Sequence, residues 1–214
     1  MIDMDGVLVH EGTLIPGADE FIARLRATGT PFLVLTNNSI FTPGDLQFRL
    51  LRSGVELPVE SIWTSALATS AFLHDQRPRG RAFAVGDAGL TTALHDIGYV
   101  LTDADPDYVV LGETRTYSFE AITKAIRLID AGARFICTNP DATGPSNEGA
   151  LPAAGSVAAM ISSNVCGPGS RPTLVIRTIG IRAQPSARTL PRTVTADQMV
   201  ADAARVMRDE DVGL

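Results

Sequence analysis

The 214-residue chain has few of the residue types that mark several common protein classes. Its two cysteines, Cys137 and Cys166, lack the CxxC spacing of a zinc or redox motif, which predicts reduced thiols. Its three histidines are scattered and have no metal-ligand spacing. No apolar run approaches the roughly 18 to 20 residues of a membrane-spanning helix, and no signal peptide precedes Asp3. We therefore expect a soluble, cytoplasmic protein with no membrane partner.

Positive charge is also scarce. The net charge is -6, the isoelectric point is near 5.0, and Lys124 is the single lysine of the chain. No basic patch is evident, which argues against nucleic acid as a partner. The chain is long enough to bury a substantial core, either as one large domain or as two small ones. Composition does not fix the oligomeric state, and a homodimer stays open.

Two acidic residues stand one position apart near the start of the chain, in the sequence IDMDGVL of residues 2–8. Alternate residues of a strand face the same way, so Asp3 and Asp5 would converge on one small site. Carboxylates this close repel each other unless a cation or a proton relieves the repulsion. With a divalent metal, one carboxylate would accept a phosphoryl group while the other moves protons. Because Asp and Gly are also common turn formers, the motif alone leaves a plain surface turn about equally open.

A second apolar segment ends in polar residues of the kind that bind phosphate. Residues 31–35 (PFLVL) are typical of a strand, and Thr36, Asn37 and Asn38 follow it directly. An ordinary strand-end turn with an Asx cap would also explain this stretch. Neighbouring parallel strands, however, bring the groups at their carboxyl ends into one crevice. Together with the acidic pair, the polar segment therefore favours a site.

Apolar segments and amphipathic helices alternate along most of the chain. This pattern predicts an α/β fold with parallel strands and right-handed crossovers. A polar, breaker-rich stretch around residues 75–80 predicts a linker between two such series. We expect strands at 32–35, 61–64, 82–85, 107–111 and 134–138, and helices at 18–28, from 43 onward, at 66–74, 90–97, 119–130 and 156–162.

These motifs resemble those of the haloacid dehalogenase-like hydrolases. The match is to the subfamily with a large α/β cap inserted after the second motif, which contains sugar-phosphate, nucleotide-monophosphate and para-nitrophenyl-phosphate phosphatases. The acidic pair and the TNNS segment carry the resemblance, which runs from residue 2 to about residue 163. Three further segments support it: GTLIPGA at 12–18, CTNPD at 137–141 and GALPAAGS at 149–156. It implies a Rossmann-like core at 1–75, a cap at 76–163 and a remainder of the core at 164–214.

The resemblance also implies a chemistry. A Mg²⁺-dependent phosphomonoesterase would act through an aspartyl-phosphate on a small phosphorylated metabolite, either a sugar phosphate or a nucleotide monophosphate. Asp3 would attack phosphorus and bind the metal, which the backbone carbonyl of Asp5 would also bind. The Asp5 side chain would be the general acid and base. The Thr36 hydroxyl and the amides of Asn37 and Gly6 would hold the phosphoryl oxygens.

The Asn-Pro-Asp segment of the predicted cap supplies candidates for leaving-group contacts. By the resemblance, Asn139 and Asp141 would reach the leaving group. The same three residues also form an ordinary turn after a buried strand, and both interpretations stay open.

The last third of the chain departs from the family pattern. The family has a Gly-Lys-Pro segment after the cap and then a Gly-Asp-x-x-x-Thr-Asp motif that completes the metal site. Here Arg171 stands at the place of the lysine and is the candidate phosphate ligand. Asp197 stands near the place of the acidic motif and is the candidate third metal ligand, although the helical periodicity around it favours an exposed helix face.

These departures leave an alternative function open, namely a catalytically impaired remnant or a non-enzymatic phosphate-binding protein. One hypothesis is that the reading frame differs from that of an ancestral gene from about residue 164. Only two residues precede Asp3, whereas a central strand has about five or six. We therefore also expect that an upstream portion is missing.

Overall fold

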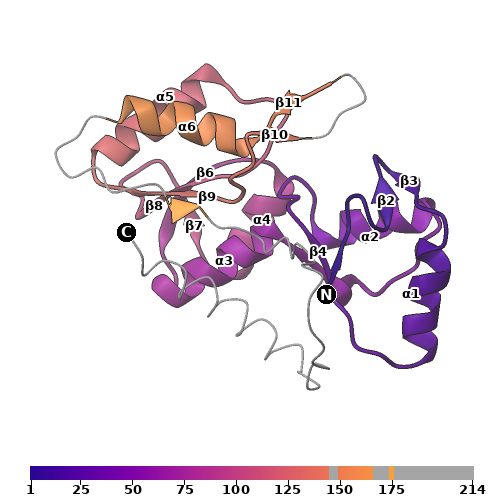
Figure 1. Cartoon of the computed structure of the whole chain (residues 1–214). Helices are drawn as coiled ribbons and strands as arrows, with labels where there is room; N and C mark the ends of the chain where they lie inside the picture. The colour runs from indigo at the N-terminus through magenta and orange to yellow at the C-terminus, as the bar shows by residue number, and fades with distance from the viewer. Residues whose placement is uncertain (145–148, 166–173, 176–214) are drawn as a thin grey trace, which may run out of the picture. The chain divides into compact units, whose positions relative to one another are not determined.

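The computed structural model describes residues 1–144, 149–165 and 174–175. These residues belong to one compact unit, Met1–Thr178, and the second unit, Ile179–Leu214, lies outside the described residues. The described part contains two parallel sheets with helices beside them (Figure 1). No helix within it is long and apolar enough to span a bilayer. The α/β prediction is therefore confirmed, whereas the predicted domain boundaries stay predictions.

The first sheet has three parallel strands in the order β1-β4-β5. Register pairs Asp3 with Leu35 and Thr36 with Thr64, so β1 and β4 end at the same edge. Apolar side chains from these strands and from the helices at Ala18–Ala27 and Pro43–Arg52 form the core against this sheet, with Leu8 and Val34 fully buried. The elements are β1 (Ile2–Asp3), a hairpin of β2 (Val9–His10) and β3 (Thr13–Leu14), α1 (Ala18–Ala27), β4 (Val34–Thr36), α2 (Pro43–Arg52), the 3-10 turn η1 (Val59–Ser61) and β5 (Ile62–Thr64).

Helix α2 shows how local sequence sets an element in place. The Thr42 hydroxyl accepts from the Asp45 amide while the Asp45 carboxylate accepts from the Thr42 amide, which is a complete capping box. Pro43 occupies the first turn, where its missing N–H costs nothing. Leu46 and Leu50, one turn apart, are buried against the first sheet. The helix therefore begins where the sequence predicts, immediately after the polar loop that follows β4.

The second sheet has five parallel strands in the order β12-β9-β8-β6-β7. In Figure 1, α5 and α6 lie on one side of it, and α3 and α4 lie side by side on the other. All four residues of the central strand, β8, are buried, as a strand covered on both faces requires. The elements are α3 (Ser65–Gln76), β6 (Arg81–Val85), α4 (Ala88–Asp96), β7 (Val100–Leu101), β8 (Tyr108–Leu111), α5 (Phe119–Asp130), β9 (Arg134–Cys137), a hairpin of β10 (Thr143–Gly144) and β11 (Leu151–Pro152), α6 (Ala154–Asn164) and β12 (Leu174–Val175).

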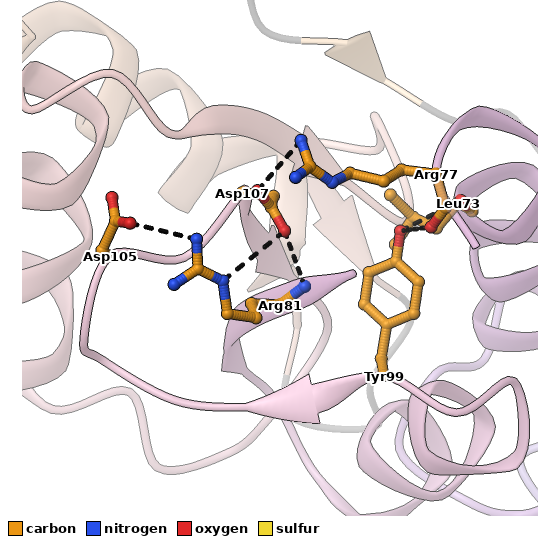
Figure 2. A network of polar contacts seen from close by, with 6 residues as sticks. All are labelled: Leu73, Arg77, Arg81, Tyr99, Asp105 and Asp107. Carbon is orange, nitrogen blue, oxygen red and sulfur yellow. Dashed lines mark hydrogen bonds and ion pairs between the residues drawn. The ribbon is translucent and has the colours of Figure 1, made fainter. Parts of the chain in front are cut away.

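A polar network holds the amino ends of the second sheet together (Figure 2). The Arg81 amide donates to the Asp107 carboxylate over 2.8 Å, and the guanidinium of Arg77 lies 3.2 Å from the same carboxylate. Arg81 also pairs with Asp105 at 3.0 Å. The buried Tyr99 hydroxyl donates to two carbonyl oxygens near the end of α3. These bonds fasten α3 to the second sheet, although our predicted boundary assigns that helix to the first domain.

The periodic segments are predicted more closely than the short ones. The predicted helix 119–130 coincides with α5, and the other predicted helices with two stated ends lie within two residues of the observed bounds. The five predicted strands correspond to β4, β5, β6, β8 and β9. The two hairpins and β7 are not predicted, because strands of two residues are too short to show an alternation.

Candidate active site

The acidic pair lies at the carboxyl end of β1. Asp3 is the last residue of that strand, and Met4, the next residue, turns its side chain into the core with 5 % exposure. The Met4 amide donates to the Leu35 carbonyl over 2.9 Å, so the pairing with β4 continues past Asp3. Asp3 and Asp5, which flank the buried Met4 in the chain, are both exposed. This is the alternation on which the predicted site depends.

The Asp5 carboxyl group meets the end of β4 through Thr36. The Thr36 side chain is 1 % exposed, and its hydroxyl donates to Asp5 Oδ2 over 3.1 Å. Although Asp5 is open to solvent on one side, desolvation by the surrounding protein raises the pKa of its carboxyl group. The hydrogen bond from Thr36 lowers that pKa, and the charge of Asp3 raises it. The net result is a carboxyl group that holds its proton more tightly than usual, as a general acid requires.

The polar loop after β4 is ordered by its own hydrogen bonds. Asn38 Oδ1 accepts from the amides of Ile40 and Phe41 over 3.0 and 2.9 Å, so the Asx cap considered for this segment is present. The Asn38 amide in turn donates to the Thr36 hydroxyl over 3.1 Å. Asn38 therefore shapes the loop here, and its predicted contact with phosphate stays a prediction.

The turn after the acidic pair also has internal bonds. The Gly6 amide donates to the Val9 carbonyl over 2.8 Å. The N–H that we predict to bind a phosphoryl oxygen is thus already paired within the turn. Its predicted role requires this bond to open or to be shared.

Asn139 and Asp141 follow β9 of the second sheet, and this loop contacts the polar loop that follows β4. Asn139 is 3 % exposed, and its Oδ1 accepts from the Asp141 amide over 3.0 Å. Asp141 is exposed, and its Oδ2 accepts from the Asn37 side-chain amide over 3.0 Å. The turn considered for this segment is therefore present, and the predicted contacts of Asn139 and Asp141 with a leaving group stay predictions. A direct bond links the loop after β4 to the loop after β9.

Two residues of this region are absent from our predicted site. Ser39 is fully buried, and its hydroxyl accepts from the Glu113 amide over 2.8 Å and from the Thr138 hydroxyl over 3.4 Å. Glu113 comes two residues after the end of β8, and that position after an apolar strand is the signal that would have identified it. Burial raises the pKa of the Glu113 carboxyl group, and so do the charges of Asp141 and Asp5.

Two glycines let these loops lie directly on helix starts. Gly89, in the first turn of α4, donates its amide to the Ile40 carbonyl over 2.8 Å, and a Cβ there would lie 2.5 Å from the Phe41 carbonyl oxygen. A Cβ on Gly155, in the first turn of α6, would lie 2.1 Å from the Pro140 carbonyl oxygen. No larger residue fits at either position without a backbone shift. The positions of both loops therefore depend on these helices.

The donors at this edge suit a hard cation. Asp3 and Asp5 supply carboxylate and carbonyl oxygens, and Mg²⁺ takes one or two carboxylates together with substrate and water oxygens. The residues present therefore fit such an ion. Within residues 1–144, 149–165 and 174–175, no cluster of three or more His, Cys, Asp or Glu side chains forms a metal site by itself. The predicted third ligand, Asp197, and the predicted phosphate ligand, Arg171, lie outside the described residues.

A cavity of about 600 Å³ lies elsewhere, at the amino ends of β6, β8 and β9. Arg77 and Arg81 line it, and both are paired with aspartates of the same wall. Parallel sheets bind their ligands at the carboxyl ends of the strands, which is the opposite edge. We therefore assign the candidate active site to the edge that carries Asp3, Asp5 and Thr36.

Comparison with a family model and comparison with curated proteins agree with each other. Residues 1–100 match a family model described as haloacid dehalogenase-like hydrolase. Over 163 residues the chain is 64% identical to a dihydroxyacetone phosphatase of Corynebacterium glutamicum, covering 76% of this chain and 59% of that protein. It is 41% identical over 159 residues to the ribonucleotide monophosphatase NagD of Escherichia coli, covering 74% of this chain and 62% of NagD. The chain thus spans about three fifths of the length of these curated relatives.

Solved structures extend the likeness to the fold. The structure of NagD from Escherichia coli superposes with a TM-score of 0.75 at 33% identity, covering 97% of this chain and 73% of NagD. A glycerol phosphate phosphatase of Mycobacterium tuberculosis, solved in complex with magnesium, gives a TM-score of 0.73 at 27% identity, covering 78% of this chain and 52% of that one.

Proposed function

Since the chain belongs to the haloacid dehalogenase-like hydrolases, we propose that it hydrolyses phosphomonoesters of small metabolites, either a sugar phosphate or a nucleotide monophosphate. The observation that carries this proposal is the bond from Thr36 to Asp5, which unites the ends of β1 and β4 in one site. The relative with 64% identity is named for a three-carbon keto-sugar phosphate. Dihydroxyacetone phosphate is therefore the first substrate to test.

In the proposed reaction Asp3 is the nucleophile. Its exposed carboxylate attacks phosphorus in line, and the P–O bond to the leaving group breaks as the new O–P bond forms. Asp5 donates its proton to the departing alkoxide, a role that its raised pKa supports. Asp5 then removes a proton from water, which attacks the aspartyl-phosphate and releases inorganic phosphate.

Groups around the acidic pair would hold the phosphoryl oxygens. The Thr36 hydroxyl lies beside Asp5 and would donate to a non-bridging oxygen in place of its bond to Asp5. We assign the backbone amide of Asn37 the same role, while its side chain joins Asp141. Asp141 and Asn139, at the carboxyl end of β9, would then face the leaving group. Fixed hydrogen-bond donors, instead of mobile water, would then stabilise the negative charge on the transferred phosphoryl group.

A bound Mg²⁺ would neutralise the negative charge that develops on the phosphoryl oxygens. The Asp3 carboxylate and the Asp5 backbone carbonyl are the described groups that would hold it. The magnesium complex of the related glycerol phosphate phosphatase supports this choice of ion. We keep Asp197 as the proposed third ligand and Arg171 as the proposed phosphate ligand.

Phosphate release from dihydroxyacetone phosphate in the presence of Mg²⁺ tests the proposal. Asp3→Asn should lower kcat by at least about a thousandfold, because the covalent step loses its nucleophile. Asp75→Asn, at an exposed position near the end of α3, is the matched control and should retain wild-type turnover. Equal turnover by the wild type and Asp3→Asn, or turnover by neither, would support the impaired or non-enzymatic alternative instead.

A further inference from the structure

Ser65 is a fully buried residue in the first turn of α3, directly after β5. Its hydroxyl donates to the backbone carbonyl of Asn37 over 2.7 Å. Register pairs Thr36 with Thr64, so the residues that follow them, Asn37 and Ser65, leave neighbouring strands of the first sheet. The third strand of that sheet therefore contributes a hydrogen-bond donor to the polar loop of the candidate site.

The Ser65 hydroxyl is not required by its own helix. Thr64 is the N-cap of α3, and its hydroxyl accepts from the Leu67 amide over 3.2 Å. A buried hydroxyl can also be satisfied within the helix, as that of Ser70 is, which donates to the Leu67 carbonyl over 2.9 Å. Ser65 instead donates to a carbonyl 28 positions earlier in the chain. Its bond therefore holds the loop after β4.

The peptide group between Asn37 and Asn38 is bonded at both ends. Its carbonyl oxygen accepts from Ser65, and its N–H, which belongs to Asn38, donates to the Thr36 hydroxyl over 3.1 Å. Because a peptide group is planar, these two bonds together fix its orientation. The side chain of Asn37 is held as well, by its bond to Asp141. The backbone of Asn37 thus has a defined orientation, and so does the N–H that we assign to a phosphoryl oxygen.

The same peptide group orients the Thr36 hydroxyl. A hydroxyl has one proton to donate and two lone pairs that accept. The Asn38 amide occupies one lone pair of the Thr36 oxygen, and the hydroxyl proton is donated to Asp5 Oδ2 over 3.1 Å. Without the bond from Ser65 the peptide group can turn, and the Thr36 hydroxyl then loses the amide that orients it.

We propose that Ser65 is a positioning residue for phosphate: by holding the Asn37 carbonyl, it keeps the Asn37 N–H and the Thr36 hydroxyl directed at the phosphoryl oxygens. This inference rests on the proposed function, because both donors belong to the proposed site. Ser65 itself is fully buried and acts only through these two residues. Since it acts on the phosphoryl side, its effect should be the same for a phosphate ester and for inorganic phosphate.

Calorimetric titration with inorganic phosphate in the presence of Mg²⁺ measures this effect without turnover. Ser65→Ala should weaken phosphate binding by about tenfold, because two donors lose their fixed orientation. Ser65→Cys, which fills the same space with a weaker donor, should give an intermediate loss. Ser70→Ala is the matched control, since it removes a buried hydroxyl that bonds only within α3, and it should change the affinity by less than about twofold. Circular dichroism at the assay temperature identifies which variants are folded.

Kinetics with dihydroxyacetone phosphate separate positioning from a loss of folded protein. A smaller folded fraction lowers kcat at an unchanged KM, whereas a loss of fixed phosphate donors raises KM. KM should therefore rise by about tenfold in Ser65→Ala and by less than about twofold in Ser70→Ala. In a Thr36→Val background, Ser65→Ala should raise KM by only about threefold, because one of the two donors that it positions is already absent.

Three results would overturn the inference: an unchanged phosphate affinity and KM in Ser65→Ala, equal losses in Ser65→Ala and Ser70→Ala, or the same factor with and without Thr36→Val. If turnover is absent but Ser65→Ala weakens phosphate binding and Ser70→Ala does not, the positioning role stands and the phosphatase assignment fails. If turnover occurs and Ser65→Ala leaves KM unchanged, only the positioning role fails. If phosphate does not bind and no ester is hydrolysed, both fail.

Discussion

Replacing Gly155 with alanine tests whether the loop at Pro140 lies directly on the start of α6. Gly155 is the second residue of its helix, and Gly44 holds the same place in α2. An added Cβ would lie 2.1 Å from the Pro140 carbonyl oxygen in the first case. In the second case its nearest neighbour would be the Thr42 hydroxyl at 3.9 Å. The same change is therefore a severe clash at one helix start and an ordinary contact at the other.

The expected stability changes have opposite signs. A methyl group forced into a packed site costs about 1–3 kcal/mol, and replacing glycine by alanine within a helix gains about 0.5–1 kcal/mol. Gly155→Ala should thus lower the free energy of unfolding by about 1–2 kcal/mol, whereas Gly44→Ala should raise it by up to about 1 kcal/mol. For a chain of this size each kcal/mol corresponds to about 2–4 °C in melting temperature. We expect Gly155→Ala to melt about 2–8 °C lower than the wild type.

Thermal unfolding followed by circular dichroism at 222 nm, with all three proteins at one concentration and in one buffer, measures these shifts. Gly89→Ala is a second test, because its Cβ would lie 2.5 Å from the Phe41 carbonyl oxygen. It should behave like Gly155→Ala. The reasoning fails if Gly155→Ala is as stable as Gly44→Ala, since the loop would then not lie against the helix.

Three further predictions follow from buried or capped groups. Ser39→Ala should lower the free energy of unfolding, measured by chemical denaturation, by about 1–3 kcal/mol, because the Glu113 amide loses its buried acceptor. Ser163→Ala, on the exposed side of α6, should lower it by less than about 0.5 kcal/mol, and equal losses would refute the prediction. Asp45→Asn should destabilise the protein at neutral pH but not in acid, because hydrogen bonds from the N-cap threonine lower the pKa of the Asp45 carboxyl group. A carboxyl group whose pKa is lower in the folded than in the unfolded state stabilises the fold at pH values above its unfolded-state pKa. This stabilisation is lost as the pH falls below about 4. Burial raises the pKa of the Cys137 thiol to about 11. In a variant with the other cysteine replaced by serine, Cys137 should therefore react with a thiol reagent at pH 8 at least about a hundredfold more slowly in the folded than in the unfolded protein. Equal rates would count against its burial.

The sequence predicts elements well where a pattern is long enough to repeat. Helix α5 is amphipathic over twelve residues and has a serine cap that accepts from the Ala121 amide, so both its type and its bounds are readable. The strands β2, β3 and β7 have two residues each and no such pattern. They form because neighbouring chain segments offer hydrogen-bond partners, which a sequence pattern does not encode.

The same distinction applies to the candidate site. Asp3 and Asp5 are predicted because they stand one position apart at the end of an expected strand, and Thr36 is predicted because it follows an apolar segment directly. The parallel arrangement then brings the two strand ends to one edge of the sheet. Glu113 and Ser39 are missed because their importance comes from contact between residues 74 positions apart. The internal pairing of the Gly6 amide is missed for a related reason, since turn geometry decides where a backbone N–H points.

The bond between Asn37 and Asp141 joins residues 104 positions apart, and this separation sets the earliest moment at which the site can be completed during synthesis. A ribosome adds about 5–20 residues per second, so the first loop leaves the tunnel roughly 5–20 s before its partner does. Throughout that interval the side-chain amide of Asn37 lacks the carboxylate to which it donates. The contact between the two loops therefore cannot form until the second sheet has been translated through β9, its fourth strand along the chain.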